Sequence, residues 1–378
     1  MMKCLAPWHS ILVRFNGDIV PDGVYLKRYG NVLQTPLNDL LNSYTASHTR
    51  DSIRSGVLPP ECEQCALKEA SVGHSRRLFF RDILNPMLED KEYDYSKNFT
   101  DIYFLEFNMS NICNLKCRMC DGINSSAWVK DDLKLAEIGN NKYFRRVDDP
   151  EFGYTNKSEQ IIAKLFEDPT PFMNLRYLSI KGGEPYMEPA NKIILQKFID
   201  LGIAKQITLD WTTNGTIVDD EIAHMARQFG HSKWTVSLEA TGELYEYIRG
   251  GKNFTFEQLE KNLVQYNFDR VIIAVTVMAY NIAHLGEIDK WFLKQKIKYP
   301  WWSIYYNNVV AKPPYLNPRI LPNNILENIE VKFPNINYTQ DPELGKHIDL
   351  FVDYTKDLDK IRNTNVLDYC PELKDLFV

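Results

Sequence analysis

Strand-type runs alternate with helix-type runs over most of the chain, from Ile102 to about Val310. This alternation is typical of a parallel α/β sheet whose strands are connected by helices. Several strand-type runs are continuously apolar or β-branched, as expected of strands that are buried on both faces. The predicted strands are residues 102–108, 175–180, 207–212, 234–238, 271–279 and 302–306. The predicted helices are residues 188–201, 219–229, 256–266 and 284–294.

Three cysteines, Cys113, Cys117 and Cys120, follow the first predicted strand within eight residues. Because the spacings are four and three residues, their sulfurs can converge on one small inorganic group. Thiolates suit zinc, copper(I) or iron–sulfur clusters. A closed zinc site usually takes four protein ligands, whereas a four-iron cluster on three cysteines leaves one iron open for chemistry. A zinc knuckle and three reduced surface thiols are the alternatives.

Composition narrows the class of protein. The formal net charge of −6 argues against a dedicated nucleic-acid-binding protein, which would carry a basic surface. No apolar run reaches the length of a membrane-spanning helix, and the N-terminal residues show no apolar signal region. We therefore expect a cytoplasmic protein with no membrane partner. In a reducing compartment, the seven cysteines favour metal binding or catalysis over disulfides.

The spacing of Cys113, Cys117 and Cys120 resembles the signature of the radical S-adenosylmethionine (SAM) superfamily. The resemblance implies an α/β fold with a partial six-stranded (β/α)6 barrel, and a 4Fe–4S cluster whose open iron binds SAM. It also implies that an electron from a flavodoxin- or ferredoxin-like donor cleaves SAM to methionine and a 5′-deoxyadenosyl radical, which abstracts a hydrogen atom from a substrate. The family usually has an aromatic residue before the third cysteine. Here that residue is Met119, which changes the packing near the adenine but not the ligand set.

Glycine-rich and polar segments follow later predicted strands, where parallel α/β folds bind ligands. Gly182-Gly183-Glu184-Pro185 resembles the GGEP motif of the family, whose backbone receives the ammonium group of SAM. Thr213-Asn214-Gly215 resembles the TNG segment of the family. Read without the resemblance, both segments are ordinary turns. The resemblance adds Asn214 to the SAM site.

Polar residues after the fourth and fifth strands complete the predicted SAM site. The resemblance assigns Ser237 and Arg249 to the SAM carboxylate and Glu239 to the ribose hydroxyls. It assigns Asn281 to adenine or substrate. Arginine suits a carboxylate because its planar guanidinium can donate two parallel hydrogen bonds. The alternative for Arg249 is an ordinary surface arginine beside a loop.

The segment before the barrel carries a predicted hairpin and further cysteines. Strand-type residues 11–15 and 19–21 flank Asn16-Gly17-Asp18, a strong hairpin turn signal. Cys4-Leu-Ala-Pro-Trp8 and Cys62-Glu-Gln-Cys65 resemble the twitch (half-SPASM) module of some radical SAM enzymes. The resemblance implies an auxiliary iron–sulfur cluster on Cys4, Cys62 and Cys65.

The sequence departs from the twitch pattern at one point. The family tends to have a cysteine after the proline that ends the hairpin, whereas Pro21 is followed here by Asp22-Gly23. The fourth ligand of the auxiliary cluster is then Cys370, Asp22 or a group of the substrate. The alternatives are a zinc ion on the four thiols or an empty site. The four thiols are those of Cys4, Cys62, Cys65 and Cys370.

We therefore predict a radical SAM enzyme in three segments, with no protein side chain predicted as catalytic. They are a twitch-like module (1–98), a core barrel (99–311) and a C-terminal extension (312–378). The first predicted substrate is a peptide or protein, and the second is a small molecule, such as an amino sugar, that is dehydrogenated. A non-catalytic zinc- or iron–sulfur-binding interaction protein is the alternative of another class. Known hydrolase and nucleotide-binding motifs are missing from the sequence, which fits chemistry carried by a cofactor.

Overall fold

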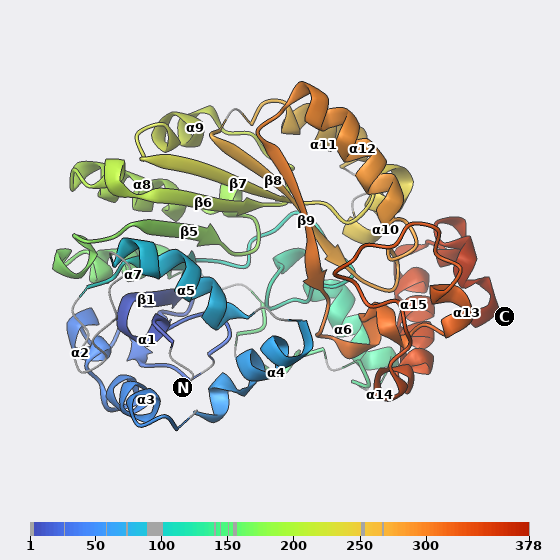
Figure 1. Cartoon of the computed structure of the whole chain (residues 1–378), viewed down its shortest axis with the longest axis horizontal. Coiled ribbons are helices and arrows are strands. Elements are labelled where there is room, and N and C mark those ends of the chain that lie inside the picture. The colour runs from blue at the N-terminus through green and yellow to red at the C-terminus, as the bar shows by residue number, and fades with distance from the viewer. Residues whose placement is uncertain are drawn as a thin grey trace. The chain divides into compact units, whose positions relative to one another are not determined.

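The computed structural model describes residues 4–25, 27–57, 59–72, 75–88, 101–139, 141–143, 145–149, 151–153, 157–250, 254–266 and 268–377. The predicted boundary between residues 98 and 99 lies outside these ranges. Two compact units make up the chain, and each is described by itself. Unit 1 is Met1–Ser110, Thr155–Trp211 and Asp219–Ser232; unit 2 is Asn111–Tyr154, Thr212–Val218 and Lys233–Val378. Figure 1 places the elements of both units along the chain. The three predicted segments stay a prediction.

The fold is mixed α/β with mostly parallel strands, which confirms the predicted class. Hydrogen-bonded strands follow in the order β3-β2-β1-β4-β5-β6 in unit 1 and β7-β8-β9 in unit 2. The last two residues of β6 belong to unit 2, and the first two residues of β7 belong to unit 1. The strands are β1 (Ser10–Arg14), β2 (Asp18–Val20), β3 (Gly30–Asn31), β4 (Phe104–Asn108), β5 (Tyr177–Lys181), β6 (Thr208–Thr213), β7 (His231–Ser237), β8 (Arg270–Val277) and β9 (Trp302–Val309). Strands β4 to β9 match the six predicted strands. Closure into a partial barrel stays a prediction.

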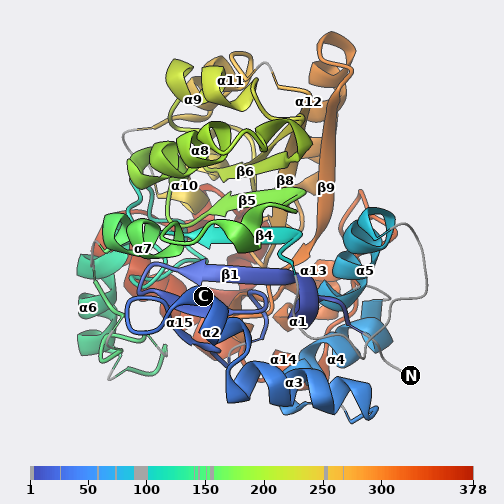
Figure 2. The same ribbon diagram turned by 90° about the vertical axis from the view of Figure 1, so that its left-hand side faces the viewer.

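The N-terminal hairpin forms as predicted and also extends the strands of unit 1. Strand β1 pairs antiparallel with β2 across a turn in which Gly17 has a φ of +90°. A Cβ at Gly17 would lie 2.9 Å from the Asn31 side chain, so the turn requires glycine. On its other side β1 pairs in parallel with β4 over five residues, from Ser10 opposite Phe104 to Arg14 opposite Asn108. The sequence did not predict this second pairing, which is visible in Figure 2, where β1, β4 and β5 lie in succession.

The N-terminal helices of unit 1 pack on the same strands. Leu5, Ala6, Phe80 and Leu84 form one buried cluster with Phe104 of β4 and Tyr177 of β5. The Phe104 ring stacks on Tyr177 and meets Phe80 edge-on, each with ring centroids 5.0 Å apart. Such aromatic pairs stabilise a core beyond the area that they bury. The helices of unit 1 are α1 (Ala6–His9), α2 (Leu37–Leu41), α3 (Tyr44–Arg54), α4 (Glu63–Val72), α5 (Arg76–Met87), α7 (Ser158–Leu165), α8 (Ala190–Asp200) and α9 (Asp220–Ala226).

Unit 2 combines three parallel strands with a helical C-terminal part. Strand β8 pairs in parallel with β7 and β9, and its register with β9 shifts between Ala274 and Thr276. Helix α15 packs against α6, which comes more than 200 residues earlier in the chain (Figure 1). The helices of unit 2 are α6 (Val129–Ile138), α10 (Gly242–Arg249), α11 (Phe256–Leu263), α12 (Leu285–Lys298), α13 (Asn323–Leu326), α14 (Pro342–Gly345) and α15 (Ile348–Arg362). Helices α8, α9, α11 and α12 confirm the four predicted helices.

Among the described residues, none of the helices has the length and apolar character needed to cross a membrane.

A buried carboxylate ties the N-terminal helices to the strands of unit 1. Glu106 of β4 is buried, and its Oε2 lies 2.9 Å both from Lys181 Nζ of β5 and from Arg76 Nη2 of α5. Burial alone would raise the pKa of Glu106. The two cations outweigh this effect and hold the pKa below its ordinary value of 4.5. Glu106 therefore stays ionised and holds three elements together.

We expect Glu106→Gln to lower the free energy of unfolding by about 2–3 kcal/mol, because it leaves two cations with a neutral partner. The cations are partly exposed, so the loss is smaller than for a fully buried pair. A folded-state pKa below the ordinary value means that this stabilisation is present above pH 4.5 and is lost as the pH falls further. Urea unfolding at several pH values measures both effects. The exposed Glu159→Gln is the control, and a wild-type advantage that persists at the lowest pH would contradict the assignment.

Candidate functional site

The three cysteines of the predicted cluster site share one loop of unit 2. Cys117 is buried, and Cys113 and Cys120 are half-buried. Burial raises the pKa of the Cys120 thiol well above its ordinary value, and the neighbouring Cys117, Asp121 and Cys113 raise it further. The three sulfurs therefore interact electrostatically. A raised pKa favours the protonated thiol, so the three cysteines would bind a metal as thiolates only where a positive charge offsets theirs.

Arg249, at the end of α10, provides one such charge. Its Nη1 donates a hydrogen bond to the Cys117 sulfur at 3.1 Å, and its Nε lies 2.7 Å from Glu239 Oε2. All three residues are buried. Burial alone would lower the pKa of Arg249, but Cys117 and Glu239 outweigh it and raise this pKa above its ordinary value. Arg249 is therefore a permanent cation beside the cysteine loop.

The Arg249–Glu239 pair retains hydrogen-bonding capacity. Arg249 Nε and Glu239 Oε2 are close, but they are not aligned as a hydrogen bond. Arg249 Nη2 is also buried and has no hydrogen-bond partner among the described residues. Buried polar atoms without partners are costly, and such atoms often mark the place of a bound ligand or water. The pair therefore offers buried donors and an acceptor to a ligand.

The turn after β6 reaches the same cysteine loop. Asn214 Nδ2 lies 3.7 Å from the Cys113 sulfur and donates to Asn114 Oδ1 at 3.0 Å. Gly215 has a φ of +79°, and a Cβ there would lie 2.4 Å from a Leu259 methyl carbon. This turn therefore requires its glycine. The predicted TNG segment and the cysteine loop are in contact within unit 2.

Two other predicted SAM residues lie nearby in the fold of unit 2. Asn281 is fully buried, and its side-chain amide donates to the carbonyls of Glu239 (2.8 Å) and Thr276 (2.9 Å). These bonds use both amide hydrogens, so Asn281 positions the Glu239 segment. Ser237 is the last residue of β7 and is half-buried. Their contacts with SAM stay predictions.

The predicted GGEP segment belongs to unit 1. Gly182 has a φ of +142°, and a Cβ there would lie 2.8 Å from the Ser110 carbonyl oxygen. Gly183 N donates to the same oxygen at 3.0 Å. Glu184 is buried, and its carboxylate accepts a hydrogen bond from Tyr186 N at 3.2 Å. The backbone here is thus a close-packed turn that only glycine permits at position 182.

In unit 1, the three N-terminal cysteines and the carboxylate of Asp22 influence one another's pKa values. Burial raises the pKa of the Cys4 thiol, and so do the neighbouring Asp22, Cys62 and Cys65. Burial, Cys65 and Asp22 raise the pKa of Cys62 to about 12. Asp22 is itself buried and accepts hydrogen bonds from the backbone N–H groups of Val24 (2.5 Å) and Tyr25 (2.9 Å). These four side chains therefore share one neighbourhood.

Cys370, the fourth thiol of the predicted auxiliary site, belongs to unit 2. It is fully buried, and its sulfur donates to the Tyr280 carbonyl at 3.2 Å. His284 and Glu372 are its neighbours. Because Cys370 and the N-terminal cysteines lie in different units, its predicted role as their fourth ligand stays a prediction.

A buried arginine that the sequence analysis missed anchors the cysteine loop to the C-terminal helix. Arg118, between two of the cysteines, is fully buried and forms an ion pair with Asp359 of α15. Its guanidinium carbon lies 3.6 Å from the centre of the Tyr247 ring, and its Nε donates to the Tyr247 carbonyl at 3.1 Å. Tyr354 of α15 donates to the Arg118 carbonyl at 2.7 Å. The partner in α15 lies 241 residues away, so no local sequence signal indicates this contact.

Two more side chains hold the carbonyl groups of the loop. Trp128 Nε1 donates to the Cys117 carbonyl at 2.8 Å. Arg145 Nη2 donates to the Cys120 carbonyl at 2.6 Å, while its Nε pairs with Asp132 Oδ1 at 2.5 Å. Together with Arg118 and Arg249, they fix the loop on several sides.

One family model and several solved structures match this chain. Residues 107–292, just under half of the chain, match the family model of the radical SAM superfamily. A search of curated proteins found no match. Among solved structures, SuiB of Streptococcus suis bound to precursor peptide SuiA is 13% identical, with 89% of this chain and 77% of that chain covered and a TM-score of 0.32. SuiB bound to S-adenosylmethionine is 14% identical, with 86% and 75% covered and a TM-score of 0.28.

The matched segment contains the three cysteines, the GGEP and TNG segments and Arg249. The family match supports a radical SAM enzyme whose substrate it does not identify. For this class of enzyme, a 4Fe–4S cluster and SAM are the implied cofactors. The soft donors of Cys113, Cys117 and Cys120 and the spare donor of Arg249 fit these groups.

We expect Asp359→Asn to lower the free energy of unfolding by about 3–5 kcal/mol, because it leaves the Arg118 guanidinium buried without a counter-ion. Urea unfolding followed by tryptophan fluorescence measures the change. Asp353→Asn is the matched control on the same helix, since Asp353 pairs with Lys142 at the exposed surface. Equal effects of the two substitutions would contradict the anchoring role of Asp359.

Proposed function

We propose that the chain is a radical SAM enzyme in which Cys113, Cys117 and Cys120 hold the 4Fe–4S cluster. Arg249 carries the proposal, because one of its nitrogens contacts a cluster cysteine while another remains buried and unpartnered. The proposed SAM-binding residues are Gly182, Gly183, Glu184, Asn214, Ser237, Glu239, Arg249 and Asn281. When bound, the cluster and SAM supply the one-electron chemistry that generates a substrate-attacking radical.

The contacts of Arg249 suggest two tasks. Its N–H group on the Cys117 sulfur withdraws negative charge from that ligand, and hydrogen bonds to cluster sulfurs set the reduction potential. Its free Nη2 supplies a buried donor for the carboxylate of SAM. Glu239, held beside Arg249, offers an acceptor to the ribose hydroxyl groups. Burial of both side chains keeps water away and strengthens each charge interaction.

The GGEP segment is the proposed binding site for the ammonium group of SAM. Gly182 has a positive φ and lies against the Ser110 carbonyl, so glycine is what allows the backbone of this turn to take the shape proposed to receive the ammonium group. The buried Glu184 carboxylate adds negative charge to that segment. A backbone carbonyl and a carboxylate are the groups that bind an ammonium ion well.

We further propose an auxiliary iron–sulfur cluster in unit 1 on Cys4, Cys62, Cys65 and Asp22. The mutual influence of their pKa values supports it, as does the burial of Asp22 at the position where the twitch pattern tends to have cysteine. Burial raises the pKa of Cys65, and the backbone of Arg77 and Arg76 partly offsets this effect, as backbone N–H groups near a cluster ligand would. Asp22 is preferred to Cys370 because its electrostatic neighbours are these thiols.

The proposed substrate is a peptide or protein, in line with the resemblance to twitch enzymes. The electron donor is proposed to be a flavodoxin- or ferredoxin-like protein, and the cytoplasm is the proposed compartment. Incubation with reductant, SAM and candidate peptides, followed by mass spectrometry of the peptides, identifies the substrate. A small molecule that alone stimulates 5′-deoxyadenosine formation would contradict the peptide proposal.

Anaerobically reconstituted protein with dithionite and SAM should release 5′-deoxyadenosine, which chromatography quantifies. Replacing all three of Cys113, Cys117 and Cys120 by alanine should abolish this release. Arg249→Met should reduce it by at least about 100-fold, as expected when a buried charged donor at a reacting group is lost. The exposed Arg227→Met is the matched control. Undiminished release by Arg249→Met at normal iron content would contradict the role of Arg249.

The auxiliary site has its own test in the variant that lacks Cys113, Cys117 and Cys120. We expect this variant to retain iron and sulfide after reconstitution, and to lose both when Cys62 and Cys65 are also replaced by alanine. Asp22→Cys should slow the loss of iron to a chelator, and Asp22→Ala should speed it, because cysteine is the stronger cluster ligand. A complete absence of residual iron would remove the auxiliary cluster from the proposal.

A further inference from the structure

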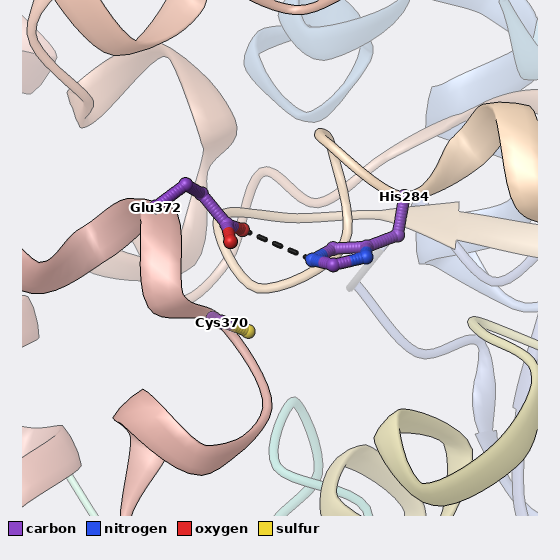
Figure 3. Close-up of side chains that lie close together, drawn as sticks. All are labelled: His284, Cys370 and Glu372. Atoms are coloured by element: carbon purple, nitrogen blue, oxygen red, sulfur yellow. Dashed lines mark hydrogen bonds and ion pairs between the residues drawn. The ribbon is translucent and has the colours of Figure 1, made fainter.

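Three metal-ligating side chains converge in unit 2, away in sequence from the cysteine loop. One donor atom each of His284, Cys370 and Glu372 lies within 4.8 Å of the other two (Figure 3). His284 immediately precedes α12, whereas Cys370 and Glu372 flank Pro371 near the C-terminus. Two segments more than 80 residues apart thus contribute to one cluster.

The imidazole has a carboxylate on each side, and one of them is hydrogen-bonded to it. His284 Nε2 lies 3.0 Å from Glu372 Oε1, as the dashed line in Figure 3 shows. His284 Nδ1 lies 3.8 Å from Glu287 Oε2 on the other side of the ring. A histidine that binds a metal usually has its second nitrogen directed at a carboxylate or carbonyl group. Glu287 is not hydrogen-bonded to Nδ1 at this distance, but its exposed side chain needs only a small rotation to accept from Nδ1, which leaves Nε2 for a cation between it and Glu372.

The thiol is the deepest of the three donors. Cys370 is fully buried, and its sulfur contacts the Tyr280 carbonyl at 3.2 Å. His284 and Glu372 are partly exposed, with 18% and 27% of their side-chain surfaces accessible. The cluster is therefore closed on the Cys370 side and open on the other. The Glu372 side is therefore the side from which solvent reaches the cluster.

A charged cavity adjoins the open side. Its volume is about 340 Å³, and Glu372 forms part of its wall. The wall also includes the carboxylates of Glu287, Glu330 and Asp375, against the single cation of Lys290. An excess of carboxylates in a recess concentrates cations there. The cavity also has room for water molecules that complete a coordination shell.

We propose that His284 Nε2, Cys370 Sγ and a Glu372 oxygen bind a zinc ion whose fourth position faces the cavity. A mixed nitrogen, sulfur and oxygen set suits zinc, whereas magnesium and calcium prefer oxygen ligands alone. On binding, the Cys370 thiol releases its proton to solvent and the thiolate becomes the ligand. Three protein ligands and an exchangeable water are the arrangement of zinc sites that bind a further ligand. The proposal does not depend on the radical SAM chemistry, and it gives Cys370 a partner other than the auxiliary cluster.

The seven cysteines of the chain allow a selective spectroscopic test. In the full-length chain with the other six cysteines changed to serine, Cys370 is the only thiol left. Titration with cobalt(II) should then produce sulfur-to-cobalt charge-transfer absorption with one cobalt per chain. Adding His284→Gln or Glu372→Gln should weaken cobalt binding at least about tenfold. Glu330→Gln removes a carboxylate of the cavity wall but no metal ligand, so it should weaken binding much less than either of these changes. Folded protein without the charge-transfer band would overturn the proposal.

A second measurement does not depend on the six-serine chain. Wild-type protein is first reconstituted with iron and sulfide, so that the other thiols are occupied, and then exposed to zinc and desalted. Elemental analysis should find one zinc per chain in wild type and in Glu330→Gln, and none in His284→Gln at equal iron content. Equal zinc in His284→Gln and Glu330→Gln would overturn the assignment.

Discussion

The loop that carries Cys113, Cys117 and Cys120 depends on buried guanidinium groups that must each be paired. Arg118 pairs with Asp359, and Arg249 lies between Glu239 and the Cys117 sulfur. An isolated charge at these depths costs several kcal/mol, so the pairs leave the loop few alternative positions. The protein therefore holds the backbone of the cysteine loop in place through contacts of its own.

This arrangement gives the C-terminal residues a part in the site. Helix α15 supplies Asp359, which also accepts a hydrogen bond from the Tyr247 hydroxyl at 3.1 Å, and Tyr354, which binds the Arg118 carbonyl. The extension that follows the last strand is thus part of the support of the cysteine loop. In unit 1, Glu106 has the corresponding role, because it joins an N-terminal helix to the strand that precedes the GGEP turn.

Hydrophobic periodicity and local motifs predicted the elements that depend on residues close together in the sequence. The six parallel strands, four helices and the hairpin at Gly17 follow from apolar runs and turn residues close in sequence. Strand β1 pairs with β4, whose residues lie 94 positions later, and Arg118 pairs with Asp359, 241 positions later. The sequence contains many other strand-type runs and carboxylates, so it does not indicate which of them is the partner. The motif spacing predicted a site on Cys4, Cys62 and Cys65, which stays a proposal, whereas the grouping of Cys370 with His284 and Glu372 required the tertiary fold.

The central claim is that the cluster on the cysteine loop has an iron that binds SAM directly. Electron paramagnetic resonance of the reduced Cys62→Ala/Cys65→Ala protein, whose iron is confined to that loop, tests it most directly. We expect SAM to change the spectrum of the cluster, and S-adenosylhomocysteine, which lacks the sulfonium charge, to give a different spectrum. An unaltered spectrum with SAM at full cluster occupancy would contradict the account.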